Sequence, residues 1–233
     1  MDIQDYERLN KKKREIPEEL QSLRLRLHRA ISWGRRAEQL SDDLDARFIF
    51  LWIGFNSLYA REPDAVAGGQ DASKTFKEIL EYLNVLVSLD KDRIHGFFWE
   101  GEIFEAGRLL VEDEYLFEFF WKSKTARVVQ DKWREECRAH KRTFTKARTF
   151  NNLQKEKRMP KVLVSTVFNR LCVLRNQLIH GSATHDSGKN RNALLRGVTI
   201  MEPFLPVCID LMLKNPDKDW GAPRYRPDDK NPI

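Results

Sequence analysis

The stretch from Phe48 to Phe55 most constrains what this chain can fold into. It reads Phe-Ile-Phe-Leu-Trp-Ile-Gly-Phe, so its apolar side chains fall at consecutive positions and not on a single stripe. A helix of about 43–61 would be apolar all round and would carry acidic residues in its first turn, where the helix dipole favours them. Such a helix must be covered on every side. A central position in a large helical bundle would cover it, and so would a dimer interface.

The rest of the chain has the same helical period, and we find no alternating strand longer than about five residues. The predicted class is therefore all-α, with a tail that is irregular after Asn215. The predicted helices cover about 17–40, 43–61, 72–89, 161–181 and 190–213. We expect one elaborated domain over 1–233, although the length also allows two small domains. Residues 90–160 would form an insertion in it.

Glycine and proline predict where these helices break. Residues 91–121 are rich in acid and indicate shorter helical pieces, interrupted near Gly96, Gly101 and Gly107. Pro203 and Pro206 are expected to interrupt the final helix, because proline removes a backbone donor.

Composition indicates a globular chain, with 41% hydrophobic and 33% charged residues. Three distant cysteines (Cys137, Cys172 and Cys208) signal neither a disulfide framework nor a zinc site, so we expect no metal and no cofactor. The N-terminus lacks a signal pattern, and the apolar run 48–60 is too short to cross a bilayer. The sequence thus predicts a cytoplasmic protein with no membrane partner.

A basic segment precedes the late helix. Residues 132–161 hold eleven Lys or Arg against three Glu, which leaves the rest of the chain slightly acidic although the net charge is +6. Such a segment raises the local concentration of phosphate polyanions such as RNA. A solvated helix face or an extended basic loop explains the composition equally well.

Side-chain directions on the late helix single out Arg175. At about 100° per residue it falls in an apolar sector, while Asn169, Asn176 and His180 form a separate polar ridge. The apolar sector consists of Val164, Val167, Phe168, Leu171, Leu174, Leu178 and Ile179. A guanidinium in such a sector needs an acceptor. It either forms a salt bridge, for example to Asp45, or waits for the phosphate of a ligand.

The segment Leu174 to Gly181 resembles the Arg-x4–6-His signature of the HEPN superfamily. Arg175 and His180 are the two fixed positions, and the polar Asn176 follows the arginine as is usual there. Residues 48–59 are similar to the early helix of many bacterial HEPN proteins. The stretch from Arg170 to the tail Asp219-Trp220-Gly221 also resembles a group of bacterial members.

That resemblance implies a helical bundle that dimerises with the two motif helices facing each other. It also implies a metal-independent endoribonuclease, acting as a toxin or defence effector on an RNA substrate, with an antitoxin protein as a possible partner. The RNA 2′-hydroxyl would attack its own phosphate. Imidazole exchanges protons near neutral pH, so His180 would be the acid or base, and Arg175 would bind the phosphate. Asn176 would hold the ring or the phosphate.

Helix geometry constrains this site. Five residues separate Arg175 from His180 by about 140° and roughly 7.5 Å of rise, so one helix aims them poorly at one atom. A site shared between two subunits, or a loosened last turn at Gly181, would bring them together. Two other functions stay open: a non-catalytic module that binds nucleotides or a partner protein, and an interaction protein that docks through its apolar helix.

Overall fold

Helices form the regular structure of the residues described, which are 3–61, 72–99, 101–117, 120–121, 135, 138–139, 142 and 161–225. Within these ranges the computed structural model has no strand, only an isolated bridge between Arg61 and Pro223, so the predicted all-α class is confirmed. In chain order the elements are α1 (Ile3–Arg14), α2 (Gln21–Glu38), α3 (Leu44–Tyr59), α4 (Ala72–Leu89), α5 (Lys91–Trp99), α6 (Gly101–Glu112), the 3₁₀ turn η1 (Glu114–Leu116), α9 (Lys161–Ile179) and α10 (Arg191–Lys214). None of the helices found in these ranges is long and apolar enough to cross a membrane.

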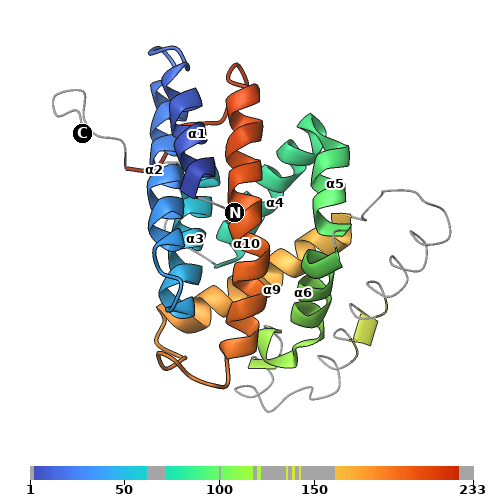
Figure 1. Cartoon of the computed structure of the whole chain (residues 1–233). Helices are drawn as coiled ribbons and strands as arrows, with labels where there is room; N and C mark the ends of the chain where they lie inside the picture. The colour runs from blue at the N-terminus through green and yellow to red at the C-terminus, as the bar shows by residue number, and fades with distance from the viewer. Residues whose placement is uncertain are drawn as a thin grey trace.

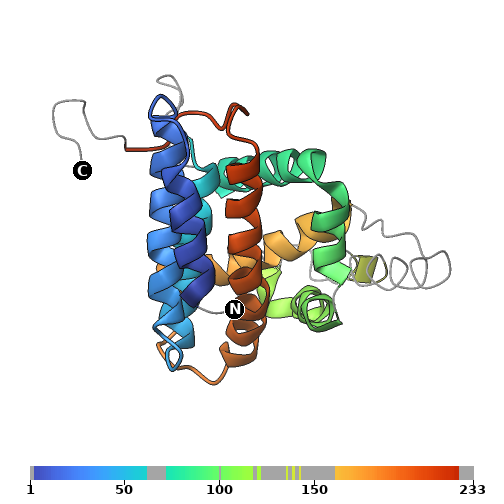
Figure 2. The same ribbon diagram turned by 45° about the horizontal axis from the view of Figure 1, so that its top comes forward.

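Four helices stand side by side with similar axes: α1, α2, α3 and α10 (Figure 1). Helix α9 runs obliquely behind α10, and α4, α5 and α6 lie on the opposite side of α10 from α1 and α2 (Figure 2). Helix α1 was not expected from the sequence, where the first helix was placed at about 17–40. Its buried face is marked by little more than Tyr6 and Leu9, each 1% exposed. The Tyr6 ring packs where a Cβ on Gly34 would stand, so that glycine lets α1 approach α2.

Helix α3 occupies the centre of the bundle. Asp43 caps its start by accepting a 2.9 Å hydrogen bond from the Ala46 amide. At its other end Phe55 is fully buried, with its ring centroid 5.3 Å from that of Phe168 in α9 and 6.0 Å from that of Phe204 in α10. The apolar run is therefore covered mainly by helices of its own chain, the first of the two arrangements that its pattern allowed.

One arginine joins α2, the end of α3 and the C-terminal tail. Arg26 is fully buried, and its guanidinium donates to the carbonyl oxygens of Ser57, Leu58 and Ala60 at 3.1, 3.2 and 2.9 Å. It also donates to the carbonyl oxygens of Gly221 and Ala222 at 3.4 and 3.0 Å. Positive charge is favourable at a helix C-terminus. The described part of the tail, residues 215–225, lacks helix, as expected, yet this contact holds it against α3.

A cluster of charges centred on Asp210 links α10 to α5 and α1. The Asp210 carboxylate accepts from Arg93 at 2.6 Å, and Lys214 and Lys12 lie at 2.9 and 3.4 Å. Burial by itself would raise the pKa of Asp210, but the hydrogen bonds from Arg93 and Lys214 outweigh it and lower the pKa to about 2.

Most of the expected helix breaks are wrong. Helix α5 runs through Gly96, α6 starts at Gly101 and runs through Gly107, and α10 passes through Pro203 and Pro206 without interruption. An interior proline costs roughly 3 kcal/mol. Burial of one long face of α10 against α3 and its neighbours outweighs that cost.

Two expectations fall outside this description. Most of the basic segment 132–161 and much of the predicted insertion 90–160 lie beyond the described residues. The single-domain organisation and the insertion at 90–160 therefore stay predictions.

Candidate functional site

The motif that runs from Arg175 to His180 lies at the C-terminal end of α9. This helix covers Lys161–Ile179, close to the predicted range 161–181. Gly181 has a φ of +68°, a conformation that glycine adopts without strain. Ser182 N donates to Gln177 O at 2.8 Å and Gly181 N donates to Leu178 O at 3.2 Å, the pair of bonds that closes a Schellman cap. His180 is thus the residue after the last helical one and is exposed. The cap fixes the direction in which the backbone leaves the helix.

The apolar sector of α9 is buried only along its first four turns. Residues from Val164 to Leu174 on this face are at most 5% exposed, but Ile179 is 48% exposed. Ile179 therefore belongs to the apolar sector by its position on the helix, but it is not part of the core. The motif lies where α9 passes from core to surface.

Arg175 is half-buried, and its guanidinium is only partly bonded. Nη1 donates to Asn176 Oδ1 at 2.9 Å, while Nε is buried and has no hydrogen-bond partner. The Tyr59 hydroxyl is also buried and unbonded; burial raises the pKa of Tyr59 well above its usual value, and the charge of Arg175 opposes that rise. The positive charge of Arg175 thus lies close to α3, and no carboxylate among the described residues forms an ion pair with it.

The expected partner of Arg175, Asp45, is engaged elsewhere. Its Oδ2 lies 3.4 Å from Arg191 Nη2 and 3.4 Å from the backbone nitrogen of Asp186. The salt-bridge interpretation of Arg175 is wrong for this carboxylate.

Asn176 and His180 line one large hollow, of about 1290 Å³, whereas Arg175 is not among its lining residues. Its walls come from α9, from the loop 182–190 and from the segment 113–121, with Phe76 of α4. The structure therefore brings Asn169, Asn176 and His180 together, as their shared ridge predicted. Arg175 is linked to the hollow by its hydrogen bond to the Asn176 side chain.

Cys172 also lines this hollow. Burial raises the pKa of its thiol to about 12, so the sulfur stays protonated at neutral pH. A protonated thiol is a poor nucleophile and a poor metal ligand.

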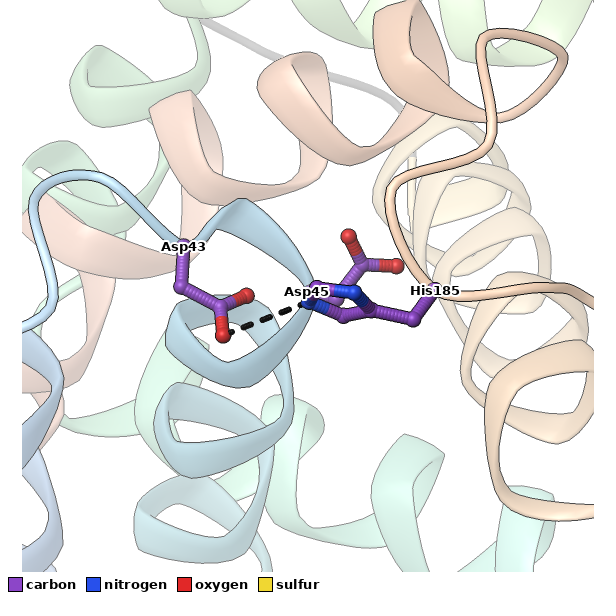
Figure 3. Close-up of side chains that lie close together, drawn as sticks. All are labelled: Asp43, Asp45 and His185. Carbon is purple, nitrogen blue, oxygen red and sulfur yellow. Dashed lines mark ion pairs between the residues drawn. The ribbon is translucent and has the colours of Figure 1, made fainter.

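A second polar cluster, absent from the sequence interpretation, holds the loop after the motif against α3. Figure 3 shows His185 reaching from this loop toward Asp43, and their Nε2 and Oδ2 atoms are 3.5 Å apart. Arg191 binds both Asp45 and Asp186. Asp43 and Asp45 lie about 140 positions before His185, Asp186 and Arg191 in the sequence, too far apart for the five residues to form a motif. The only local signal is the pair of aspartates at the start of α3.

The cluster also offers possible metal ligands. One ligand atom each from Asp43, Asp45 and His185 can lie within 4.8 Å of the others. Arg191 already compensates the charge of Asp45, however, so a cation would have to compete with a guanidinium for that carboxylate. Ion pairing accounts for the arrangement.

The sequence interpretation also missed two aromatic residues that line the hollow. Tyr115 and Trp121 both line the hollow and are 56% and 46% exposed. Between them in sequence, Phe117 packs against α9, where the fully buried Arg170 lies over its ring, 4.3 Å from the centroid. These aromatic residues come from the segment that the sequence described only as acidic and helical.

Comparison of the chain with protein-family models, with curated proteins and with solved structures finds no match. The function must therefore be argued from the residues themselves.

Proposed function

We propose that this chain is a metal-independent endoribonuclease of the HEPN type, a toxin or defence effector, whose site uses Arg175 and His180. The observation that carries the proposal is the bonding of Arg175. A half-buried guanidinium with a buried, unbonded Nε is unfavourable unless an anion completes it. Its neighbour Asn176 and the exposed His180 line a hollow large enough for a nucleic-acid strand. A phosphodiester is the anion that suits this combination.

The chemistry requires only these groups. His180 takes the proton from the 2′-hydroxyl or gives one to the departing 5′-oxygen. Arg175 stabilises the additional negative charge on the phosphate, for which its planar fork of donors is suited. Asn176 connects them, because its oxygen holds Arg175 while the residue itself lines the hollow.

We place the complete site between two subunits. Within one chain Arg175 lies outside the hollow that His180 lines, so the pair does not converge there. Ile179, which is 48% exposed beside His180, gives the end of α9 an apolar contact for a second copy. The arginine of one subunit would then face the histidine of the other.

The first experiment measures cleavage of a labelled RNA by the purified full chain in excess EDTA. Wild type should cleave, and Arg175→Ala and His180→Ala should each reduce the rate at least 100-fold, roughly the size expected for losing a proton-transfer or charge-stabilising group. Arg196→Ala on α10 serves as the matched arginine control and should cleave like wild type. Equal cleavage by all four proteins, or none by wild type, would reject the proposal.

Mixing the two inactive variants tests the shared site. A dimer of one Arg175→Ala and one His180→Ala subunit holds one intact site and one empty site if each site takes its arginine and histidine from different subunits. Random exchange would then restore about one quarter of wild-type activity. No restoration, with exchange verified, would place both residues of each site in one subunit.

One observation favours a second candidate, a non-catalytic module that binds a nucleotide. The same separation of Arg175 from the hollow would leave a single subunit able to bind an anion without cleaving it. This candidate predicts saturable nucleotide binding by a monomer with no RNA cleavage at any protein concentration.

A further inference from the structure

Two large aromatic side chains that line the hollow, Tyr115 and Trp121, lie at the surface. Tyr115 is 56% exposed and Trp121 is 46% exposed, although both belong to residue types that usually bury most of their area. Both line the hollow that His180 lines. Exposed aromatic rings beside a polar cavity need an explanation.

These rings are held in place and are not loose surface groups. The Tyr115 carbonyl oxygen accepts from Trp121 Nε1 and from Gln177 Nε2, each at 2.8 Å, which ties the aromatic segment to the motif helix. Phe120 packs edge-on against both rings, with centroid distances of 5.1 Å. Asp113 accepts from the Tyr115 backbone nitrogen at 3.0 Å. A fixed, exposed aromatic surface loses little entropy when a flat ligand stacks on it.

The α9 wall is rich in hydrogen-bond donors. Asn176 Oδ1 accepts from Arg175 at 2.9 Å, and Asn169 Oδ1 accepts from Arg170 at 3.2 Å. Each asparagine therefore uses its oxygen on a neighbouring arginine and keeps its amide NH₂ group for a ligand. The two residues are seven positions apart, two turns along one helix face, and Lys189 adds a positive charge. Asp113 is the one carboxylate among the residues known to line the hollow.

From this arrangement we infer that the hollow is a base-binding subsite: an unpaired base stacks on Tyr115 or Trp121 while Asn169 and Asn176 donate to its acceptor atoms. Stacking is open to every base, since each has a flat π-face, and it excludes a base that is paired inside a duplex. The inference rests on the proposed function, because it takes RNA as the substrate. It assigns to Tyr115 and Trp121 the task of selecting where the strand enters.

The size of the hollow favours a strand over a single nucleotide. Sites for drug-sized ligands measure about 300–1000 Å³, and this one is about 1290 Å³. Several nucleotides can therefore lie between the aromatic wall and His180. A free mononucleotide has the same stacking chemistry, and the experiment separates the two.

The test measures binding in a protein that does not cleave. Full-length His180→Ala would be titrated into a labelled single-stranded oligoribonucleotide of about 12 nucleotides, with anisotropy as the readout. Adding Tyr115→Ala or Trp121→Ala should weaken binding roughly tenfold each, in line with one lost base stack. Tyr115→Phe and Trp121→Phe keep an aromatic face and should bind normally. Tyr225→Ala, at the most exposed aromatic position of the described chain, is the control and should change nothing.

An abasic oligonucleotide separates stacking from a folding defect. It should bind Trp121→Ala and the parent protein equally, because there is no base to stack. Unchanged binding of the normal oligonucleotide by both alanine variants would overturn the inference even if the EDTA assay had established cleavage. If the alanine variants of Tyr115 and Trp121 bind more weakly but Arg175→Ala and His180→Ala cleave RNA as wild type does, the subsite is supported and the proposed function is rejected. Full competition by a mononucleotide at the same molar concentration would overturn the assignment of a strand.

Discussion

Replacing Arg175 with methionine should make the protein more stable and abolish its activity. Methionine keeps the length and flexibility of the arginine stem but removes the charge and the buried Nε. An unbonded buried donor costs about 1–3 kcal/mol, and Arg175 has one such atom. Removing the guanidinium also removes its hydrogen bond to Asn176, which lowers the free energy of unfolding by about 0.5–1.5 kcal/mol and offsets part of the stabilisation. We expect a net stabilisation of about 1 kcal/mol, or about 3 °C in Tm for a domain of this size.

Arg26 provides the opposite case in the same chain. It is fully buried, and its guanidinium is bonded to carbonyl oxygens at the end of α3 and in the tail. Arg26→Met leaves those carbonyls without their donor and should destabilise the fold by about 3 kcal/mol. The two substitutions change the same atoms, so their opposite signs would come from the surroundings alone.

Urea unfolding followed by circular dichroism measures both variants, and the EDTA cleavage assay follows the first. The reasoning is refuted if Arg175→Met lowers the free energy of unfolding by about 1 kcal/mol or more, since Arg175 would then have a structural role. A residue kept for function at the expense of stability is a common feature of active sites.

Two further predictions concern positions described above. The pKa of Asp210 is lowered to about 2 from an ordinary 3.8, so its charge contributes stability that is present above about pH 4 and lost as the pH falls to 2. Between pH 4 and pH 2 the free energy of unfolding of wild type should therefore fall by up to about 2 kcal/mol more than that of Asp210→Asn. Equal pH profiles of the two proteins would contradict this prediction. Gly181→Ala should cost about 1–2 kcal/mol because φ is +68° there, and should reduce cleavage by redirecting His180. Gly188→Ala, which has open space around its Cβ position, should be neutral in both assays, and an equal loss in both variants would reject the role of the cap.

Periodicity predicted the long helices well, because a buried stripe or a fully apolar run leaves a plain signal. The bounds of α4 and α9 agree with the sequence, and Gly181 ends α9 as expected. Prediction from local sequence, such as proline as a helix breaker or an apolar stripe as a helix signal, failed where tertiary packing determines whether a helix forms. Pro203 and Pro206 lie inside a continuous helix, and α1 forms although Tyr6 and Leu9 are the only buried residues among its described side chains.

For the site, spacing on one helix was sufficient to group Asn169, Asn176 and His180. It could not say which acid meets which arginine, because that depends on how helices distant in sequence approach each other. From the sequence, a salt bridge between Arg175 and Asp45 was one possibility, but in the structure Asp45 pairs with Arg191. The aromatic wall was missed for the same reason, since nothing near Tyr115 indicates that α9 lies beside it.

The contact made by Arg26 sets an order for folding. Helices α2 and α3 are made early and form a local pair, but two of the carbonyls that receive Arg26 are about 195 positions further along the chain. Until residues 221 and 222 are synthesised, the buried guanidinium of Arg26 lacks part of its hydrogen bonds, so the α2–α3 pair cannot reach its final stability. Long-range closure of this kind slows folding. A fragment that stops before Gly221 should therefore behave as an incompletely folded protein, even though it contains every helix of the described residues.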